Sequence, residues 1–117
     1  MTESIVIALD AMGGDHAPGV ILRGLNIARK RYPKAKFLVF GDESRVVPAI
    51  RRYPKLLQRC EIRHTTQVIA ADEKPSHALR RFPDSSMRRA IDAVRQGEAE
   101  GIVSAGNTGA LFVGNST

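Results

Sequence analysis

Two short loops hold the residues of this sequence that are best suited to chemistry. The first loop contains two carboxylates, two adjacent glycines and a histidine: Asp10, Gly13, Gly14, Asp15 and His16. Adjacent glycines let the backbone turn with positive φ and let its N–H groups approach a ligand closely. A helix that begins near Ala17 would add unpaired N–H donors and a partial positive charge, which suits a phosphate.

Two other interpretations of this first loop remain open. Asp10, Asp15 and His16 are residue types that can bind a divalent ion or relay a proton. Alternatively, the loop is only a tight turn capped by Asp15, with His16 in solvent. The segment has neither G-x-G-x-x-G spacing nor the Gly-Lys-Ser/Thr ending of a P-loop, so it is not a standard nucleotide signature.

The second loop has the same layout and offers many hydrogen-bond donors without a charge. Its residues are Ser104, Ala105, Gly106, Asn107, Thr108 and Gly109. This composition favours the binding of a phosphate or an oxyanion by backbone amides. The alternative is a glycine-rich turn that enters a helix, with Asn107 or Thr108 as the cap.

Other polar residues carry weaker signals. Lys74, between acids and a proline, could neutralise a phosphate as a point charge, although a solvated charged turn also explains it. Helix capping accounts for the serines at 85 and 86. His64 and His77 have no partner at the spacing of a metal site or a catalytic triad, so we expect both to be structural.

Composition excludes several classes of protein. The chain has 117 residues, a formal net charge of +6 and a single cysteine, Cys60, which excludes an intramolecular disulfide and any multi-cysteine zinc site. The longest apolar run, residues 5–9, is far shorter than the ~20 residues of a membrane helix. No secretory signal is visible, and a reducing cytoplasm fits these facts best.

The positive charge is concentrated in one part of the chain. Residues 16–63 contain 12 Lys and Arg but only three acids, which gives a local excess of +9. This region is either a solvated helical surface or a docking face for an acidic protein, nucleic acid or anionic membrane. Nucleic acid is disfavoured because the chain has only six Phe and Tyr residues and no known binding motif.

The elements that must position these loops alternate between strands and helices. Short apolar runs predict strands at 5–9, 36–40, 61–64 and 101–104. Helical spacing predicts helices from Pro18 to just before Pro33, from 43 to 52 and from 86 to 96, although Pro48 weakens the second. Residues 71–84 look irregular, with a turn of helix around 77–81.

This alternation is typical of an α/β domain with a mainly parallel sheet. We expect one domain over residues 1–117, with no linker and no internal repeat. Ligands of such sheets collect at the carboxyl ends of the strands. Both glycine-containing loops are predicted at that edge.

Six motifs along the chain resemble those of a known family. They are Ile-Ala-Leu-Asp-Ala-Met-Gly-Gly-Asp-His-Ala-Pro (7–18), Phe-Gly-Asp-Glu (40–43), His-Thr-Thr (64–66), Asp-Glu-Lys-Pro (72–75), Asp-Ser-Ser-Met-Arg (84–88) and Val-Ser-Ala-Gly-Asn-Thr-Gly-Ala (103–110). In this order they closely resemble the N-terminal region of the bacterial phosphate acyltransferases of phospholipid synthesis. The chain corresponds to the N-terminal third of that family's full-length chain.

The resemblance implies a reaction, a fold and partners. The reaction converts acyl-[acyl carrier protein] and inorganic phosphate into acyl phosphate and free carrier protein. The implied fold is a three-layer, Rossmann-like α/β/α domain akin to the isopropylmalate dehydrogenase and phosphotransacetylase group, here truncated. It implies no metal, nucleotide or other cofactor, and a homodimer of full-length chains in the cytoplasm, with peripheral membrane association left open.

The resemblance also suggests roles for the loop residues. Gly13, Gly14, Ser104 and the residues of the second loop (Gly106, Asn107, Thr108 and Gly109) would position phosphate or the acyl-phosphate oxygens. Lys74 would neutralise phosphate charge, while Asp10, Asp15 and His16 would orient donors or handle a proton. The basic region would be a docking face for the carrier protein.

Three rival interpretations of the sequence remain open. The first is an α/β domain that binds a nucleotide through the Gly13–Gly14 loop. The second is a basic module that binds nucleic acid without catalysis. The third is a fragment that has no function alone.

Overall fold

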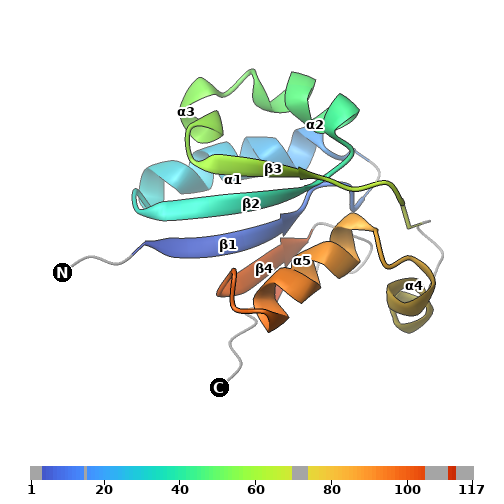
Figure 1. The fold of residues 1–117 in the computed structure, drawn as a ribbon. Coiled ribbons are helices and arrows are strands. Elements are labelled where there is room, and N and C mark those ends of the chain that lie inside the picture. Colours follow the sequence, from blue (N-terminus) through green and yellow to red (C-terminus); the bar gives the residue numbers. More distant parts are fainter. Residues whose placement is uncertain (1–3, 15, 70–73, 105–110, 113–117) are drawn as a thin grey trace.

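The chain forms a five-stranded sheet with helices on both faces (Figure 1). A computed structural model describes residues 4–14, 16–69, 74–104 and 111–112. The strands are β1 (Ile5–Asp10), β2 (Ala35–Gly41), β3 (Cys60–His64), β4 (Gly101–Ser104) and β5 (Leu111–Phe112). The helices are α1 (Gly19–Arg31), α2 (Glu43–Ile50), α3 (Pro54–Leu57), α4 (Pro75–Arg81) and α5 (Ser86–Arg95).

The sheet is mainly parallel, as the alternation of elements predicts. Its strand order is β3-β2-β1-β4-β5. β1 is paired in parallel with β2 on one side and β4 on the other, and β2 is paired in parallel with β3. Only the short β5 runs antiparallel, beside β4. The four parallel strands therefore end at one edge of the sheet, where their arrowheads lie together in Figure 1.

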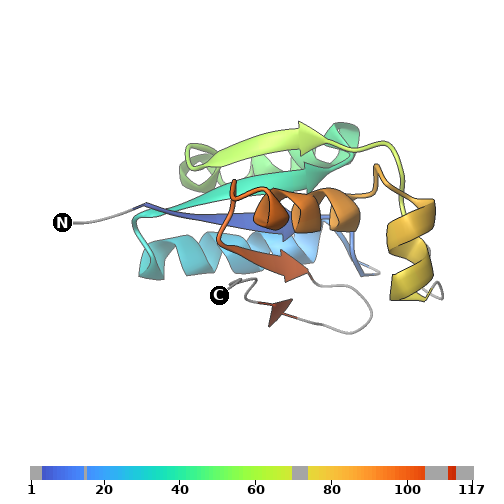
Figure 2. The same ribbon diagram turned by 60° about the horizontal axis from the view of Figure 1, so that its bottom comes forward.

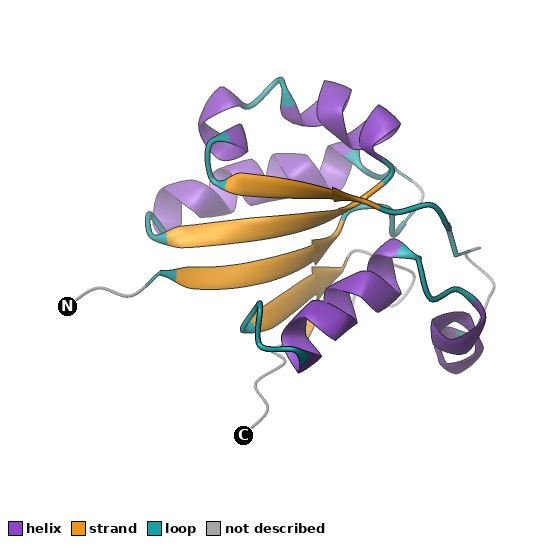
Figure 3. Ribbon diagram, in the orientation of Figure 1, coloured by secondary structure: helices purple, strands orange, loops and turns teal. Residues whose placement is uncertain are grey.

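Two apolar cores separate the three layers of the domain (Figures 1 and 3). Alternate residues of β2 point to opposite faces, so that Phe37 and Val39 join one core while Leu38 and Phe40 join the other. The first core packs under α1, α2 and α3, through residues such as Leu22. The second packs under α5 through small residues (Ala90, Ala93). The α/β/α layering inferred from the resemblance is confirmed.

The ends of the main helices follow from local sequence. α1 ends at Arg31 because Pro33 cannot continue it, and three basic residues in its last turn suit the negative end of the helix dipole. Ser85 caps α5 by accepting a hydrogen bond from the Arg88 backbone N–H at 3.1 Å. Gly97 follows α5 with a φ of +81°, a conformation that glycine adopts without strain.

Some elements differ from the sequence prediction. α4 is a helix of two turns in a stretch expected to be mainly irregular. α3 and β5 were not expected, because four and two residues are too few to show a periodic pattern. α2 contains Pro48 and stops at Ile50, which is shorter than predicted.

The turned view in Figure 2 shows the short β5 beside β4, and α5 on one side of the sheet with α1 on the other. No helix in the described part of the chain is long and apolar enough to span a membrane.

Candidate functional site

The carboxyl edge of the sheet brings together residues that are far apart in the sequence. Asp10 ends β1 and lies opposite Phe40 of β2 on one side and Ser104, the last residue of β4, on the other. Gly41 ends β2 opposite His64 of β3. The strands that precede the two glycine-containing loops therefore both end at this edge, where the sequence predicted the loops, and they are neighbours in the sheet.

Asp10 is the centre of a buried hydrogen-bond network at this edge. Its side chain is 1% exposed. Oδ1 accepts hydrogen bonds from the Met12 backbone N–H at 3.1 Å and from the Ser86 hydroxyl at 2.5 Å. Oδ2 accepts one from the Ser104 hydroxyl at 2.8 Å. One carboxylate thus joins the ends of β1 and β4 to the start of α5.

This network corrects the interpretation of the serine pair. Ser85 is the helix cap, as expected, but Ser86 is not a cap, because its hydroxyl donates to Asp10. The contact spans 76 positions in the chain. Local sequence contains no signal for such a long-range contact. A serine near the start of a helix is predicted to be an N-cap, whatever its hydroxyl contacts after folding.

The loop after β1 begins buried and becomes exposed at its glycines. Ala11 and Met12 are buried, and the Ala11 backbone N–H donates to the Phe40 carbonyl at 2.9 Å. Gly14 is exposed and has a φ of +87°, so the positive φ expected of the glycine pair is present there. The peptide bond between Ala17 and Pro18 is cis. The first residues of the loop are therefore held by packing, while its glycines can present backbone groups to solvent.

Gly41 leaves room for that loop. A Cβ atom added at Gly41 would lie 2.9 Å from a methyl group of Val46 and 3.1 Å from the side chain of Met12. Real Cβ atoms almost never approach other atoms this closely, so only glycine fits at the end of β2. Close packing thus explains why the Phe-Gly-Asp-Glu motif has a glycine at this position.

A second cluster lies beside the same edge, after β3. Asp84 accepts hydrogen bonds from the Thr66 hydroxyl at 2.5 Å and from the Thr66 backbone N–H at 2.9 Å, and it pairs with Arg89 at 2.6 Å. The hydrogen bond from the Thr66 hydroxyl is the main reason that the pKa of Asp84 lies below its ordinary value. This cluster fixes the segment after β3 to the start of α5.

The remaining candidate residues fall into two groups. Lys74 is exposed directly before α4, and His16 is exposed at the start of α1, where it lines a groove between α1 and α2. Asp15 and the second loop (Gly106, Asn107, Thr108 and Gly109) lie outside the described residues. Their convergence with Gly13 and Gly14 stays a prediction, to which the adjacent ends of β1 and β4 add support.

Two other titratable side chains, those of His64 and Cys60, take part in hydrogen bonding or packing within the fold. His64 Nδ1 accepts a hydrogen bond from the Glu43 backbone N–H at 3.1 Å, which is the structural role expected of it. Cys60 packs against the core, and its burial raises the pKa of the thiol to about 12. Among the described residues, no group of three or more His, Cys, Asp or Glu is arranged to hold a metal ion.

This geometry defines a class of protein, namely a mainly parallel α/β domain with polar loops at the carboxyl edge of its sheet. Residues 5–116 match the model of a family described as "Fatty acid synthesis protein", and the chain belongs to that family. It is 54% identical over 112 residues to a protein of Rhodospirillum centenum named phosphate acyltransferase, covering 96% of this chain and 32% of that protein.

Other relatives carry the same name. A phosphate acyltransferase of Azorhizobium caulinodans is 54% identical over 113 residues, and one of Rhodospirillum rubrum is 50% identical over 112 residues. Each alignment covers 96% of this chain and 32% of the relative. The chain therefore spans about a third of the length of these curated relatives.

Sequence reasoning missed the residues that hold the edge together. Ser86, Thr66 and Gly41 all lie in motifs that carry the family resemblance, so their presence in those motifs was a signal that they matter. Their partners, Asp10, Asp84 and Met12, became evident only from the arrangement of the strands.

Proposed function

We propose that the protein of which this chain forms part transfers a fatty acyl group from acyl-[acyl carrier protein] to inorganic phosphate. Membership of a fatty acid synthesis family supports this class of reaction, as do relatives named phosphate acyltransferase. The observation that carries the proposal is the adjacency of the two strands that precede these loops. β1 and β4 are parallel neighbours whose last residues, Asp10 and Ser104, share a hydrogen bond.

The proposed reaction needs an oriented nucleophile and a stabilised oxyanion. A phosphate oxygen attacks the carbonyl carbon of the thioester and forms the new C–O bond. The C–S bond then breaks, and the carrier thiolate leaves and takes up a proton. Binding both reactants in one site removes much of the entropic barrier, and backbone N–H donors stabilise the charge on the carbonyl oxygen. No covalent enzyme intermediate is required.

We assign the loop residues to these tasks. Backbone N–H groups of Gly13, Gly14 and Gly106, with Asn107 and Thr108, would hold the phosphate oxygens or the oxygens of the forming acyl phosphate, including the carbonyl oxygen on which charge develops. Ser104 and Gly109 would complete the second loop, and Lys74 would neutralise phosphate charge. Asp10 is a positioning residue, because its carboxylate is already occupied by three hydrogen bonds. Asp15 and His16 would orient donors or carry a proton.

The test is an assay of carrier-thiol release from acyl-[acyl carrier protein], with the chain extended to full length. We expect release to require phosphate and to give acyl phosphate. Asn107→Ala should lower turnover by roughly 100-fold, the usual cost of losing one oxyanion donor. Asn26→Ala, a change in α1 away from the sheet edge, is the matched control and should leave turnover unchanged.

The same assay separates the rival functions. Release that does not depend on phosphate, or an Asn107→Ala variant with full activity, would contradict the assignment. Binding of ATP or NAD to the protein, without displacement by phosphate, would favour a nucleotide site instead. The 117-residue chain, assayed beside the full-length protein, shows whether this part is active alone.

Two further properties follow from the proposed reaction and the family resemblance. We expect full-length chains to form a homodimer, which light scattering after gel filtration measures directly. We also expect the protein in the cytoplasm, where its carrier substrate is found, with any membrane association being peripheral. Fractionation of cells into soluble and membrane material tests this expectation.

A further inference from the structure

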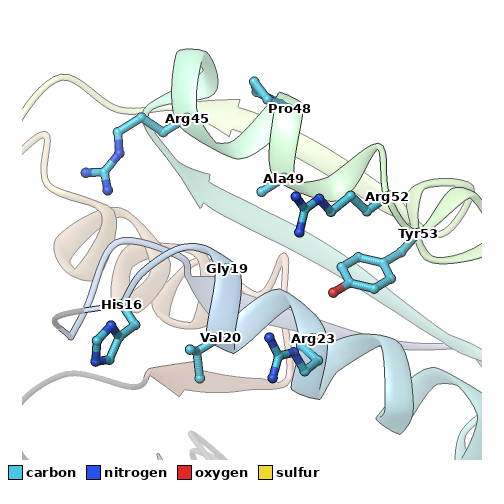
Figure 4. Close-up of a pocket in the computed structure, with 9 residues that line it drawn as sticks. All are labelled: His16, Gly19, Val20, Arg23, Arg45, Pro48, Ala49, Arg52 and Tyr53. Carbon is cyan, nitrogen blue, oxygen red and sulfur yellow. The ribbon is translucent and has the colours of Figure 1, made fainter.

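A basic groove lies between α1 and α2, on the surface of the sheet's first helical layer (Figure 4). Its volume is about 390 Å³. Three arginines line it, Arg23 from α1 and Arg45 and Arg52 from α2 and the turn after it. The other lining residues are His16, Gly19, Val20, Pro48, Ala49 and Tyr53. All three arginines are exposed.

The arginines come from different elements around the groove. Arg45 lies in α2, and Arg52 lies in the turn that follows the end of α2 at Ile50. The Arg45 guanidinium donates to the Ala17 carbonyl at 2.9 Å, so this arginine is held beside the start of α1. Figure 4 shows Arg45 and Arg52 on the α2 side and Arg23 on the α1 side of the same space.

The groove combines this charge with apolar surface. Of the described residues, those that line the groove include no carboxylate. Val20 is 54% exposed on α1, and Pro48 is exposed on α2. Positive groups on both sides of a groove that also has apolar side chains complement a helix that has carboxylates flanking apolar side chains.

The groove also lies next to the candidate site. His16, at one end of it, belongs to the loop that carries Gly13 and Gly14 from the carboxyl edge of the sheet. A partner seated in the groove would therefore be held close to the loop that is proposed to bind phosphate.

We propose that this groove docks an acidic helix of the acyl carrier protein. This inference rests on the proposed function, which requires the acyl group to arrive on a carrier protein of acidic character. The groove supplies recognition of the protein part of that substrate, whereas the loops after β1 and β4 act on its thioester. Arg23 and Arg52 are binding residues in this scheme and take no part in the chemical step.

The test compares two substrates of the full-length protein. One is acyl-[acyl carrier protein], and the other is the same acyl group on a small pantetheine thioester, which has no protein surface. Arg23→Glu with Arg52→Glu should raise KM for the carrier substrate at least about ten-fold, with kcat nearly unchanged, because attraction becomes repulsion at two contacts. KM for the small thioester should stay the same.

A matched control is provided by neighbouring arginines outside the groove. Arg31→Glu with Arg51→Glu makes the same change in net charge on the same elements, at exposed residues that do not line the groove. We expect this control to change KM for the carrier by less than about two-fold, the size of a weak surface effect. Added salt should raise the wild-type KM, because it screens attraction, and should not raise the KM of the groove variant, in which it screens repulsion.

The outcomes separate this inference from the proposed function. If neither thioester gives phosphate-dependent product with the wild-type protein, the proposed function fails. If both are substrates and the groove variant behaves like its control, the docking inference alone is wrong. Loss of binding to anionic vesicles or to RNA in the groove variant, with KM for the carrier unchanged, would also overturn it.

Discussion

Asp10 shows how one buried side chain can organise a functional edge. Its carboxylate is placed where β1 ends and accepts hydrogen bonds from the loop after β1, from α5 and from β4. A buried carboxylate is costly unless its oxygens are satisfied, and here both are. Asp10 thereby joins the ends of β1 and β4 to the start of α5, and we propose that it acts as a positioning residue.

Replacement of Asp10 should therefore affect stability as well as turnover. Asp10→Ala would leave the hydroxyls of Ser86 and Ser104 without their acceptor, and hydrogen bonds to charged groups are worth more than neutral ones. We expect the free energy of unfolding to fall by about 3 kcal/mol. Urea denaturation followed by circular dichroism measures this.

Asp10→Asn is the informative companion variant. Its amide oxygen can still accept a hydrogen bond, so we expect it to lose less stability than Asp10→Ala. Equal stability of Asp10→Ala and the wild-type chain would show that the network does not hold the edge together.

Cys60 gives a prediction that depends on pH. Burial raises the pKa of its thiol from 9.0 to about 12, so the folded state keeps the thiol protonated up to much higher pH than the unfolded state does. Only the thiolate reacts with iodoacetamide, and three pKa units correspond to about a thousand-fold less thiolate at pH 8. We expect alkylation of the native chain to be roughly a thousand-fold slower than in concentrated urea.

Mass spectrometry of the alkylated chain over time measures both rates. The native rate should keep rising with pH beyond pH 10, where the unfolded chain has already reached its plateau. A native rate within ten-fold of the denatured rate at pH 8 would contradict the half-buried position of Cys60 at the start of β3.

At the scale of elements, the order of strands places the site. The sequence pattern was sufficient for the four parallel strands, which are short apolar runs, and for α1 and α5, which have helical spacing and a recognisable cap or stop. It could not predict the contacts of Ser86 or Gly41, which depend on segments that meet only after folding. The location of the loops was thus predictable, while the network that fixes their base was not.

Two glycine substitutions test this packing at the element scale. Gly41→Ala would push a methyl group against Val46 and Met12, and such overpacking should lower the free energy of unfolding by about 1–3 kcal/mol. Gly24→Ala, in the exposed middle of α1, meets no atom within 4 Å and should raise it by about 0.5–1 kcal/mol. Chemical denaturation of both variants measures the two changes.

The decisive result is whether the two substitutions change the free energy of unfolding in opposite directions. If Gly41→Ala were as stable as Gly24→Ala, the end of β2 would have more space than the structure gives it. The Phe-Gly-Asp-Glu motif would then need another explanation for its glycine.

For the whole molecule, the basic groove and the loop after β1 share His16, so the two halves of the proposed function would lie next to each other. The carboxyl edge of the sheet would hold phosphate and the thioester, and the basic groove between α1 and α2 would hold the carrier protein. The excess of positive charge in residues 16–63 is thus partly gathered on one face. The chain spans 32% of the length of the relative from Rhodospirillum centenum, so the reaction is proposed for the full-length protein.

The most direct measurement is a phosphate titration of the full-length protein, labelled with 15N at glycine and asparagine and followed by NMR. We predict that the backbone amide signals of Gly13, Gly14, Gly106 and Asn107 shift together and give a single dissociation constant. Shifts in only one of the two loops, or two different constants, would contradict a shared anion site.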